Sequence, residues 1–156
     1  KRFNALVFGG EKATVMAGRQ EVLGHHNIRM IPVKEDMSHL FLVNEALDNN
    51  EIMSMPADRI IGSAKSVTSV FMDAEARFPA GPLSVATMKG LDVLAVNVMK
   101  TSAKHYKVYV ARLSYDKHAP RRQQMQQLAD SYVKELERRV RQYPLQWFNF
   151  YDFWSR

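Results

Sequence analysis

The stretch FMDAEARFPAGPLSVATMKG, residues 71–90, decides how the middle of the chain folds. Apolar runs flank its centre, where Pro79, Gly81 and Pro82 stand almost side by side. Proline is favoured in the first turn of a helix, and glycine lets another group approach the backbone closely. We therefore predict a strand that ends at Phe78 and Pro79, followed by a helix that begins at Pro82. The start of such a helix presents free N–H groups and a partial positive charge, which predicts an anion-binding site.

Strand and helix patterns alternate upstream of this stretch. Apolar runs predict strands over residues 4–8, 28–33 and 51–55, with a helix over 10–26 and a second helix capped by Ser38. The second helix is expected to turn one apolar face inward, made of Leu40, Phe41, Val43, Ala46 and Leu47. This β-α-β-α-β order indicates parallel strands joined by right-handed crossovers.

Later strands are expected to pair in antiparallel fashion. A strand over 66–72 follows with no intervening helix, which predicts a hairpin or an excursion along the sheet edge. Strands over 92–100 and 107–113 are antiparallel, because the short link between them cannot form a parallel crossover. We expect a mixed α/β fold with a mostly parallel central sheet flanked by helices, in one domain spanning residues 1–156.

The C-terminal part predicts a long amphipathic helix over 120–142 and an aromatic terminal segment. The apolar stripe of the helix consists of Met125, Leu128, Ala129, Tyr132, Val133, Leu136 and Val140. The basic residues placed off the stripe are Arg121, Arg122, Lys134, Arg138, Arg139 and Arg141. Their surface is either a solvated face or a site for an acidic lipid or carrier. The segment YPLQWFNFYDFW, 143–154, opens a short helix at Pro144, and its rings either pack on the body or anchor the chain at a membrane interface.

Composition limits the classes of function. The 156 residues contain no cysteine, which excludes disulfides, thiolate zinc sites and cysteine nucleophiles. The net charge of +6 either only keeps the protein soluble or favours an anionic partner: phosphate, acidic lipid, an acidic carrier or nucleic acid. No apolar run is long enough to span a bilayer. The chain begins at Lys1 without methionine and enters a strand at once, so we expect a fragment or a processed product.

Motifs for common chemistries are missing from the sequence. It contains no glycine-rich nucleotide motif, no zinc-protease motif and no serine-hydrolase elbow. His25 and His26 lack a third ligand at a suitable spacing, so neither a metal nor a cofactor is predicted. Asp58 and Arg59 follow the strand over 51–55, where α/β sheets collect ligand-binding groups. The alternative is a turn in which Asp58 caps the backbone and Arg59 is solvated.

Three blocks, taken in order, resemble the lysophospholipid and lipid A acyltransferase superfamily, especially its bacterial lauroyl- and myristoyl-transferase-like branch. A strand leads into an Asp-Arg motif, here Asp58-Arg59; an F-P-x-G-P block follows, here residues 78–82; a further strand comes next, here 93–98. The ending LERRVRQYPLQWFNFYDFW resembles the branch's usual end, where a helix runs into P-x-Q/D-W and aromatic residues. The resemblance covers about Asn4 to Trp154.

The catalytic pair of that superfamily is absent from these residues. The pair is a histidine with an acidic residue five positions later, where the histidine is the general base and the carboxylate orients it. The residues five positions after His25, His26, His39, His105 and His118 are Met30, Ile31, Asn44, Val110 and Gln123. We therefore predict no catalytic residue here, and expect either the C-terminal portion of an acyltransferase domain or a degenerate relative that only binds.

The resemblance implies a role in moving a fatty acyl group from an acyl carrier protein or coenzyme A thioester to a lipid or lipid-like acceptor. It implies that Asp58 and Arg59, with Phe78, Pro79 and Gly81, line the substrate site; Arg77 and Lys65 are weaker candidates for the same anion. The expected location is the cytoplasmic face of a bacterial inner membrane, as a peripheral protein, or the cytoplasm. The alternative is a non-enzymatic basic module for anionic membrane surfaces. Nucleic acid is not expected, because basic and aromatic residues are segregated along the chain.

Overall fold

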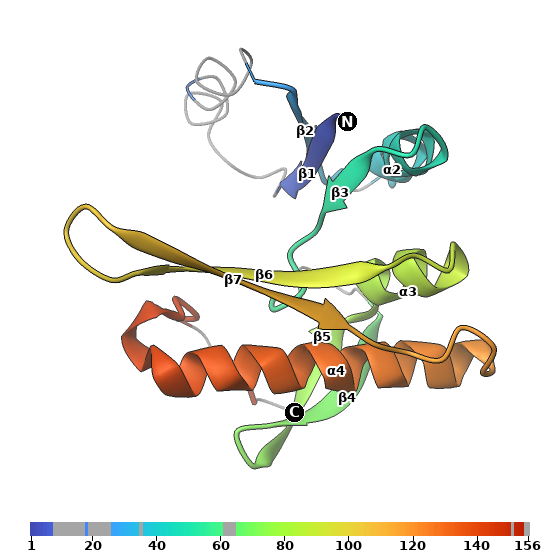
Figure 1. Cartoon of the computed structure of the whole chain (residues 1–156). Helices are drawn as coiled ribbons and strands as arrows, with labels where there is room; N and C mark the ends of the chain where they lie inside the picture. Colours follow the sequence, from blue (N-terminus) through green and yellow to red (C-terminus); the bar gives the residue numbers. More distant parts are fainter. Residues whose placement is uncertain (8–17, 19–25, 35, 61–64, 151, 155–156) are drawn as a thin grey trace. The chain divides into compact units, whose positions relative to one another are not determined.

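The chain forms two compact units, Lys1–Pro56 and Ala57–Arg156, each with its own buried apolar residues. The computed structural model describes residues 1–7, 18, 26–34, 36–60, 65–150 and 152–154 (Figure 1). The helix expected over 10–26 and the residue His25 lie outside this described part, apart from Gly18 and His26. The prediction of one domain over 1–156 stays a prediction.

The first unit contains a three-stranded parallel sheet. Its middle strand, β1 (Phe3–Val7), pairs with β2 (Ile28–Pro32) on one side and β3 (Ile52–Ser54) on the other. The parallel order predicted from the alternating strand and helix patterns is therefore confirmed for these strands. Asn4 of β1 is fully buried, and its side-chain Nδ2 donates to Glu51 Oε2 at 2.9 Å.

Helix α2 (His39–Asp48) lies between β2 and β3 in the sequence of the first unit. Val43 and Phe41 were both predicted to lie on the inward apolar face. Val43 is buried, which confirms the prediction for this residue, but Phe41 is 78% exposed, so the prediction for Phe41 is wrong. Ser38 precedes the helix as predicted, but its hydroxyl makes no capping hydrogen bond. Asp36 Oδ1 instead accepts the N–H of Ser38 at 2.9 Å, so a residue two positions before Ser38 stabilises the turn that precedes the helix.

Among its described residues, the second unit contains two antiparallel hairpins and two α-helices. The first hairpin joins β4 (Ser66–Phe71) to β5 (Ala74–Pro79), and α3 (Ala80–Met88) starts directly after it. The second hairpin joins β6 (Val93–Lys100) to β7 (Tyr106–Leu113), which confirms the predicted antiparallel pairing. Helix α3 begins two residues before Pro82, the residue at which it was expected to start.

The long helix α4 (Arg121–Gln142) lies alongside both hairpins (Figure 1). Its predicted apolar stripe is confirmed, since Leu128, Ala129, Val133, Leu136 and Val140 are buried. Arg139 was placed off the stripe but is only 3% exposed. Its charge is met by Glu135 Oε1 at 2.9 Å and Gln142 Oε1 at 2.8 Å, and its guanidinium lies 4.0 Å from the ring centroid of Tyr109.

The core of the second unit consists of two apolar clusters that share one tyrosine. Phe71 and Phe78 stand in the first cluster, Leu128 and Ala129 in the second, and Tyr132 packs partly buried against both. A parallel sheet in the first unit, two hairpins in the second and the long C-terminal helix together confirm the mixed α/β class. The strands of the described residues fall into three sheets.

The terminal segment, residues 143–154, opens with the predicted short helix, η1 (Pro144–Gln146). Part of this segment packs on the body. The rings of Trp147, Phe153 and Trp154 lie 5.1, 5.5 and 5.9 Å from the ring of Phe71. Trp154 Nε1 also donates to Phe71 O at 3.2 Å. The segment is therefore part of the folded unit over these residues.

Candidate functional site

The register of the first hairpin brings two predicted cations to the start of α3. Ser66 stands opposite Pro79, so Lys65 comes next to the first helical residue, and Lys65 O accepts the N–H of Ala80 at 2.8 Å. Arg77 Nε donates to Ser66 Oγ at 3.0 Å, which holds this guanidinium at the same end of the hairpin. Both basic side chains are exposed. Positive charge therefore gathers where the helix dipole is also positive.

The start of α3 differs in detail from the predicted anion site. Because the helix begins at Ala80, Gly81 is its second residue and Pro82 its third. The amide of Ala80 is used by Lys65 O, and Pro82 has no N–H to offer. A Cβ added to Gly81 would meet nothing within 4 Å, so the space in the side-chain direction of this residue is open. The Gly81 amide thus lies on an exposed residue with open space beside it.

Phe78 and Pro79 form the buried side of the strand-helix joint, the point where β5 ends and α3 begins. Phe78 is 1% exposed, and its ring packs edge-on against Phe71 at 6.0 Å and against Phe153 at 5.6 Å. Pro79 is buried and stands at the N-cap of α3 in an extended conformation. The two residues fix where the strand ends and the helix begins, while Lys65, Arg77 and Gly81 are on the solvent side.

Asp58 and Arg59 contact other parts of the second unit. Arg59 Nη2 donates to Asn149 Oδ1 at 3.2 Å and to Phe148 O at 3.3 Å, so the terminal segment orients the guanidinium. Burial, and after it the charge of Asp58, raises the pKa of the Tyr132 hydroxyl. The ring of Tyr132 packs edge-on against Phe78 at 6.2 Å.

Tyr132 therefore has both the Asp-Arg motif and the strand-helix joint as neighbours. No hydrogen bond between described residues joins Arg59 to Lys65 or Arg77, and residues 61–64 between them lie outside the described part.

Sequence reasoning missed two residues of this arrangement, Asn149 and Tyr132. Tyr132 was counted only as part of an apolar stripe, although a tyrosine hydroxyl in such a stripe needs a polar neighbour. Asn149 stands 90 residues from Arg59 in the sequence, so no local pattern connects them. Its Nδ2, like the Nε1 of Trp147, is buried with no hydrogen-bond partner among the described residues.

Two of the described histidines make polar side-chain contacts with near neighbours in the sequence. Lys34 N donates to His39 Nδ1 at 3.2 Å, and His105 Nδ1 lies 2.7 Å from Ser102 Oγ. Within the described residues, no three His, Cys, Asp or Glu side chains come close enough to hold a metal ion.

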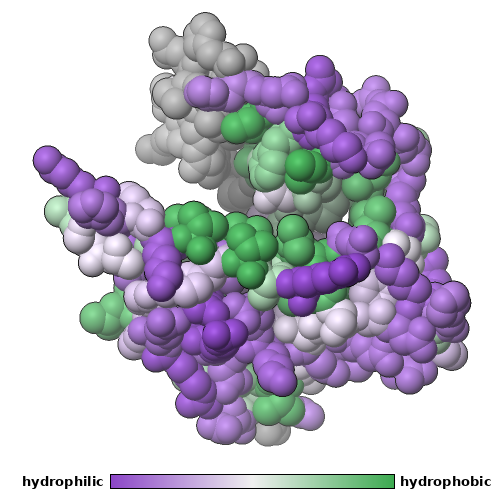
Figure 2. All heavy atoms as spheres, viewed as in Figure 1, coloured by the Kyte–Doolittle hydropathy of each residue, from purple (hydrophilic) through white to green (hydrophobic). Residues whose placement is uncertain are grey.

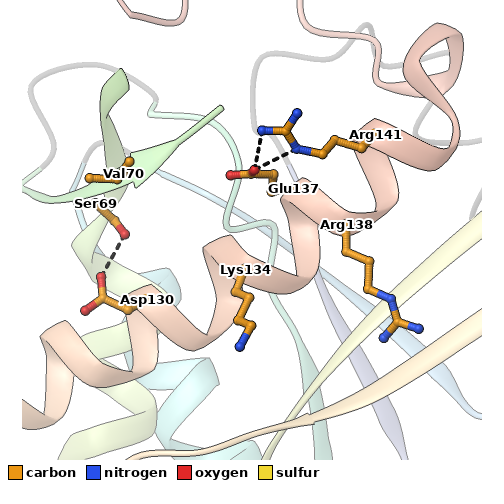
Figure 3. A pocket seen from close by; sticks show the side chains of 7 residues that line it. All are labelled: Ser69, Val70, Asp130, Lys134, Glu137, Arg138 and Arg141. Atoms are coloured by element: carbon orange, nitrogen blue, oxygen red, sulfur yellow. Dashed lines mark hydrogen bonds and ion pairs between the residues drawn. The ribbon is translucent and has the colours of Figure 1, made fainter. Parts of the chain in front are cut away.

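An open groove of about 680 Å³ lies between β4 and α4, away from the predicted site residues (Figure 3). Its lining is Ser69, Val70, Asp130, Lys134, Glu137, Arg138 and Arg141. Arg141 Nη2 lies 2.7 Å from Glu137 Oε1, and Ser69 Oγ donates to Asp130 Oδ1 at 2.7 Å. Three basic and two acidic side chains line the groove, so its net charge is small.

The comparisons with known proteins agree with the order of blocks in the sequence. None of the described helices combines the length and apolar character that crossing a membrane requires. No curated protein matches the chain significantly. A family model, by contrast, matches residues 13–156, which include the Asp-Arg motif, the joint at α3 and the terminal segment. The chain belongs to the bacterial lipid A biosynthesis acyltransferase family.

Proposed function

We propose that this chain supplies the anion-binding part of an acyltransfer site. Lys65, Arg77 and the Gly81 amide, together with Arg59 beside Asp58, bind a phosphate. That phosphate belongs either to the headgroup of a lipid acceptor or to the phosphopantetheine of an acyl carrier protein or coenzyme A donor. The family supports acyl transfer to a lipid in general, and the donor and acceptor named here are proposals.

The observation that carries this proposal is the register of β4 and β5. It places Lys65 against the first residue of α3 and ties Arg77 to the neighbouring Ser66. Two exposed cations beside the Gly81 amide favour an anion together, because each contributes positive potential at one place. Phe78 and Pro79 stay buried beneath and keep the geometry fixed.

The chemical step needs a group that this sequence lacks. An acceptor hydroxyl or amine attacks the thioester carbonyl carbon, the C–S bond breaks, the thiol leaves, and a general base takes the acceptor's proton. No histidine in the chain has an acidic residue five positions later. We therefore propose that residues 1–156 bind and orient substrate and transfer no acyl group alone. Product formation from acyl coenzyme A and a lysophospholipid above a protein-free control would refute this.

Binding of coenzyme A, measured by calorimetry, tests the anion site. Lys65→Gln and Arg77→Gln are each expected to weaken binding about tenfold, since each removes a charge-assisted contact to phosphate. Arg112→Gln is the matched control, because Arg112 is an exposed arginine of β7 paired with Asp92 at 3.1 Å. Equal affinities for all four proteins would show that the phosphate does not bind at this joint.

A further inference from the structure

Arg59 lies on irregular backbone, so no helix or strand of its own fixes the direction of its side chain. Residues 55–60 follow β3 and belong to no regular element, and Arg59 is exposed. A long, exposed arginine samples many rotamers, and a ligand that binds it must restrict them at a cost in free energy. Contacts that restrict the guanidinium before the ligand arrives therefore raise the affinity for that ligand.

Two acceptors of the terminal segment restrict this guanidinium. Arg59 Nη2 donates to Phe148 O at 3.3 Å and to Asn149 Oδ1 at 3.2 Å. This nitrogen has two N–H groups, so each acceptor can take one of them. Both acceptors are uncharged, since one is a backbone carbonyl and the other is an amide oxygen. They orient the guanidinium and leave its positive charge in place, whereas a carboxylate at the same position would offset the charge.

The amide of Asn149 is turned in the direction that Arg59 requires. Its oxygen faces the guanidinium, because the reverse orientation would set N–H groups against N–H groups. As a consequence, Asn149 Nδ2 is buried with no hydrogen-bond partner among the described residues. A buried N–H group without an acceptor destabilises the folded chain. Such a cost is typical of a side chain placed for function rather than for stability.

The backbone around Asn149 is fixed by an aromatic neighbour. Asn149 N donates to Trp147 O at 2.9 Å, and the ring of Trp147 lies 5.1 Å from the ring of Phe71 and 4.9 Å from that of Phe153. Figure 1 shows η1 at one end of the second unit, and Figure 2 shows hydrophobic atoms among hydrophilic ones on the surface there. Asn149 is thus a polar side chain in a mostly apolar segment, held where it meets Arg59.

We propose that Asn149 is a positioning residue of the anion site: its neutral amide orients the guanidinium of Arg59 toward a substrate phosphate without cancelling the positive charge. This inference rests on the proposed function, because it concerns the phosphate that Arg59 binds there. The terminal segment is then part of the substrate site. The alternative is a purely structural role, in which the contact with Arg59 only fastens the segment to the rest of the unit.

Coenzyme A binding to the full chain, measured by calorimetry beside urea unfolding, separates the two roles. Asn149→Ala should weaken coenzyme A binding about fivefold, since it removes a hydrogen bond that orients a charged group. Asn149→Asp keeps the acceptor and adds a negative charge next to the guanidinium. It should keep or raise the urea midpoint, because an ion pair fastens the segment at least as firmly, yet weaken coenzyme A binding about tenfold. A purely structural role predicts instead that affinity and stability change in the same direction.

The double variant Arg59→Gln, Asn149→Ala shows whether Asn149 acts through Arg59. Arg59→Gln alone should weaken coenzyme A binding about tenfold, and adding Asn149→Ala should change it by less than about twofold more.

Gln146 provides the matched controls, because it fastens the same segment through a different residue. Gln146 Oε1 accepts the N–H of Lys100 at 2.8 Å, and its Nε2 donates to Lys100 O at 2.9 Å. Gln146→Ala removes this fastening, and Gln146→Glu adds a negative charge to the segment. Both should change coenzyme A affinity by less than about twofold.

Three results would overturn the inference. Equal losses from Asn149→Ala and Gln146→Ala, or independent losses in the double variant, would show that Asn149 does not act through Arg59. Unchanged affinity in both Asn149 variants, with weaker binding by Lys65→Gln, would refute this role of Asn149 and leave the anion site standing. A wild type that binds no coenzyme A would refute the proposed function and this inference together. If Asn149→Ala loses its cooperative urea transition, Asn149→Asp compared with Gln146→Glu decides alone, because that replacement has almost the same size.

Discussion

Tyr132 is the residue at which the apolar core of the second unit meets the charged motif. It packs against both core clusters, and burial followed by the charge of Asp58 raises the pKa of its hydroxyl above the ordinary value of 10. Both causes disfavour the tyrosinate, so the fold accepts only the neutral form. A tyrosine whose pKa is raised by folding contributes stability that is fully present below its unfolded pKa and is lost as pH rises above it.

The corresponding prediction concerns alkaline stability. Above pH 10 the free energy of unfolding should fall by up to about 1.4 kcal/mol per pH unit through Tyr132, because the unfolded chain releases this proton first. Tyr132→Phe should flatten the fall by that amount. Urea unfolding at neutral pH and at about pH 11 measures the difference. Identical pH slopes for the two proteins would place the hydroxyl in water-like surroundings.

Among the elements, the strand-helix joint at the end of β5 depends on one ring. Phe78→Ala removes edge contacts to Phe71, Tyr132 and Phe153 at the start of α3. The expected loss in the free energy of unfolding is about 3–5 kcal/mol, as for other fully buried phenylalanines. Val70→Ala on β4 is the control, since Val70 is 64% exposed and should cost less than about 0.5 kcal/mol. Similar urea midpoints for the two variants would contradict a structural role for this ring.

Helix α4 contains a buried ion pair that the basic-face pattern did not predict. Glu135→Ala leaves the guanidinium of Arg139 buried without its carboxylate partner, which should cost about 3–5 kcal/mol in unfolding free energy. Arg138→Ala is the comparison, because Arg138 pairs with the same carboxylate at 3.7 Å but has a side chain that is 71% exposed. It should change the unfolding free energy by less than about 1 kcal/mol. Equal losses would mean that burial does not decide the strength of these pairs.

Whether the sequence predicted a feature depends on whether the interactions that form it are local or join residues far apart in the chain. The stripe of α4 and the β6–β7 pairing rest on periodicity and a short link, and both were predicted. The first turn of α3 was misplaced because proline fits its third residue as well as its first. The side chains of Arg59 and Asn149 meet across 90 residues of sequence, and the side chain of Gln146 bonds the backbone of Lys100 across 46, so composition gives no information about either contact.

At the scale of the whole molecule, charge and apolar surface are unevenly distributed along the chain. The second unit holds the long helix, both hairpins and the terminal segment. Both core clusters also lie within it, between Val67 and Phe153. Every residue that we propose for anion binding therefore belongs to this one unit.

A piece spanning residues 57–156 should consequently fold without the first unit. Both tryptophans of the chain, Trp147 and Trp154, lie in it, so their fluorescence reports on this unit alone. Trp147 and Trp154 pack on Phe71, and we expect the isolated piece to keep the same emission and a cooperative urea transition close to that of the full chain. Loss of the transition in residues 57–156 would instead support one cooperative domain over residues 1–156, because the two clusters would then need residues 1–56 to form.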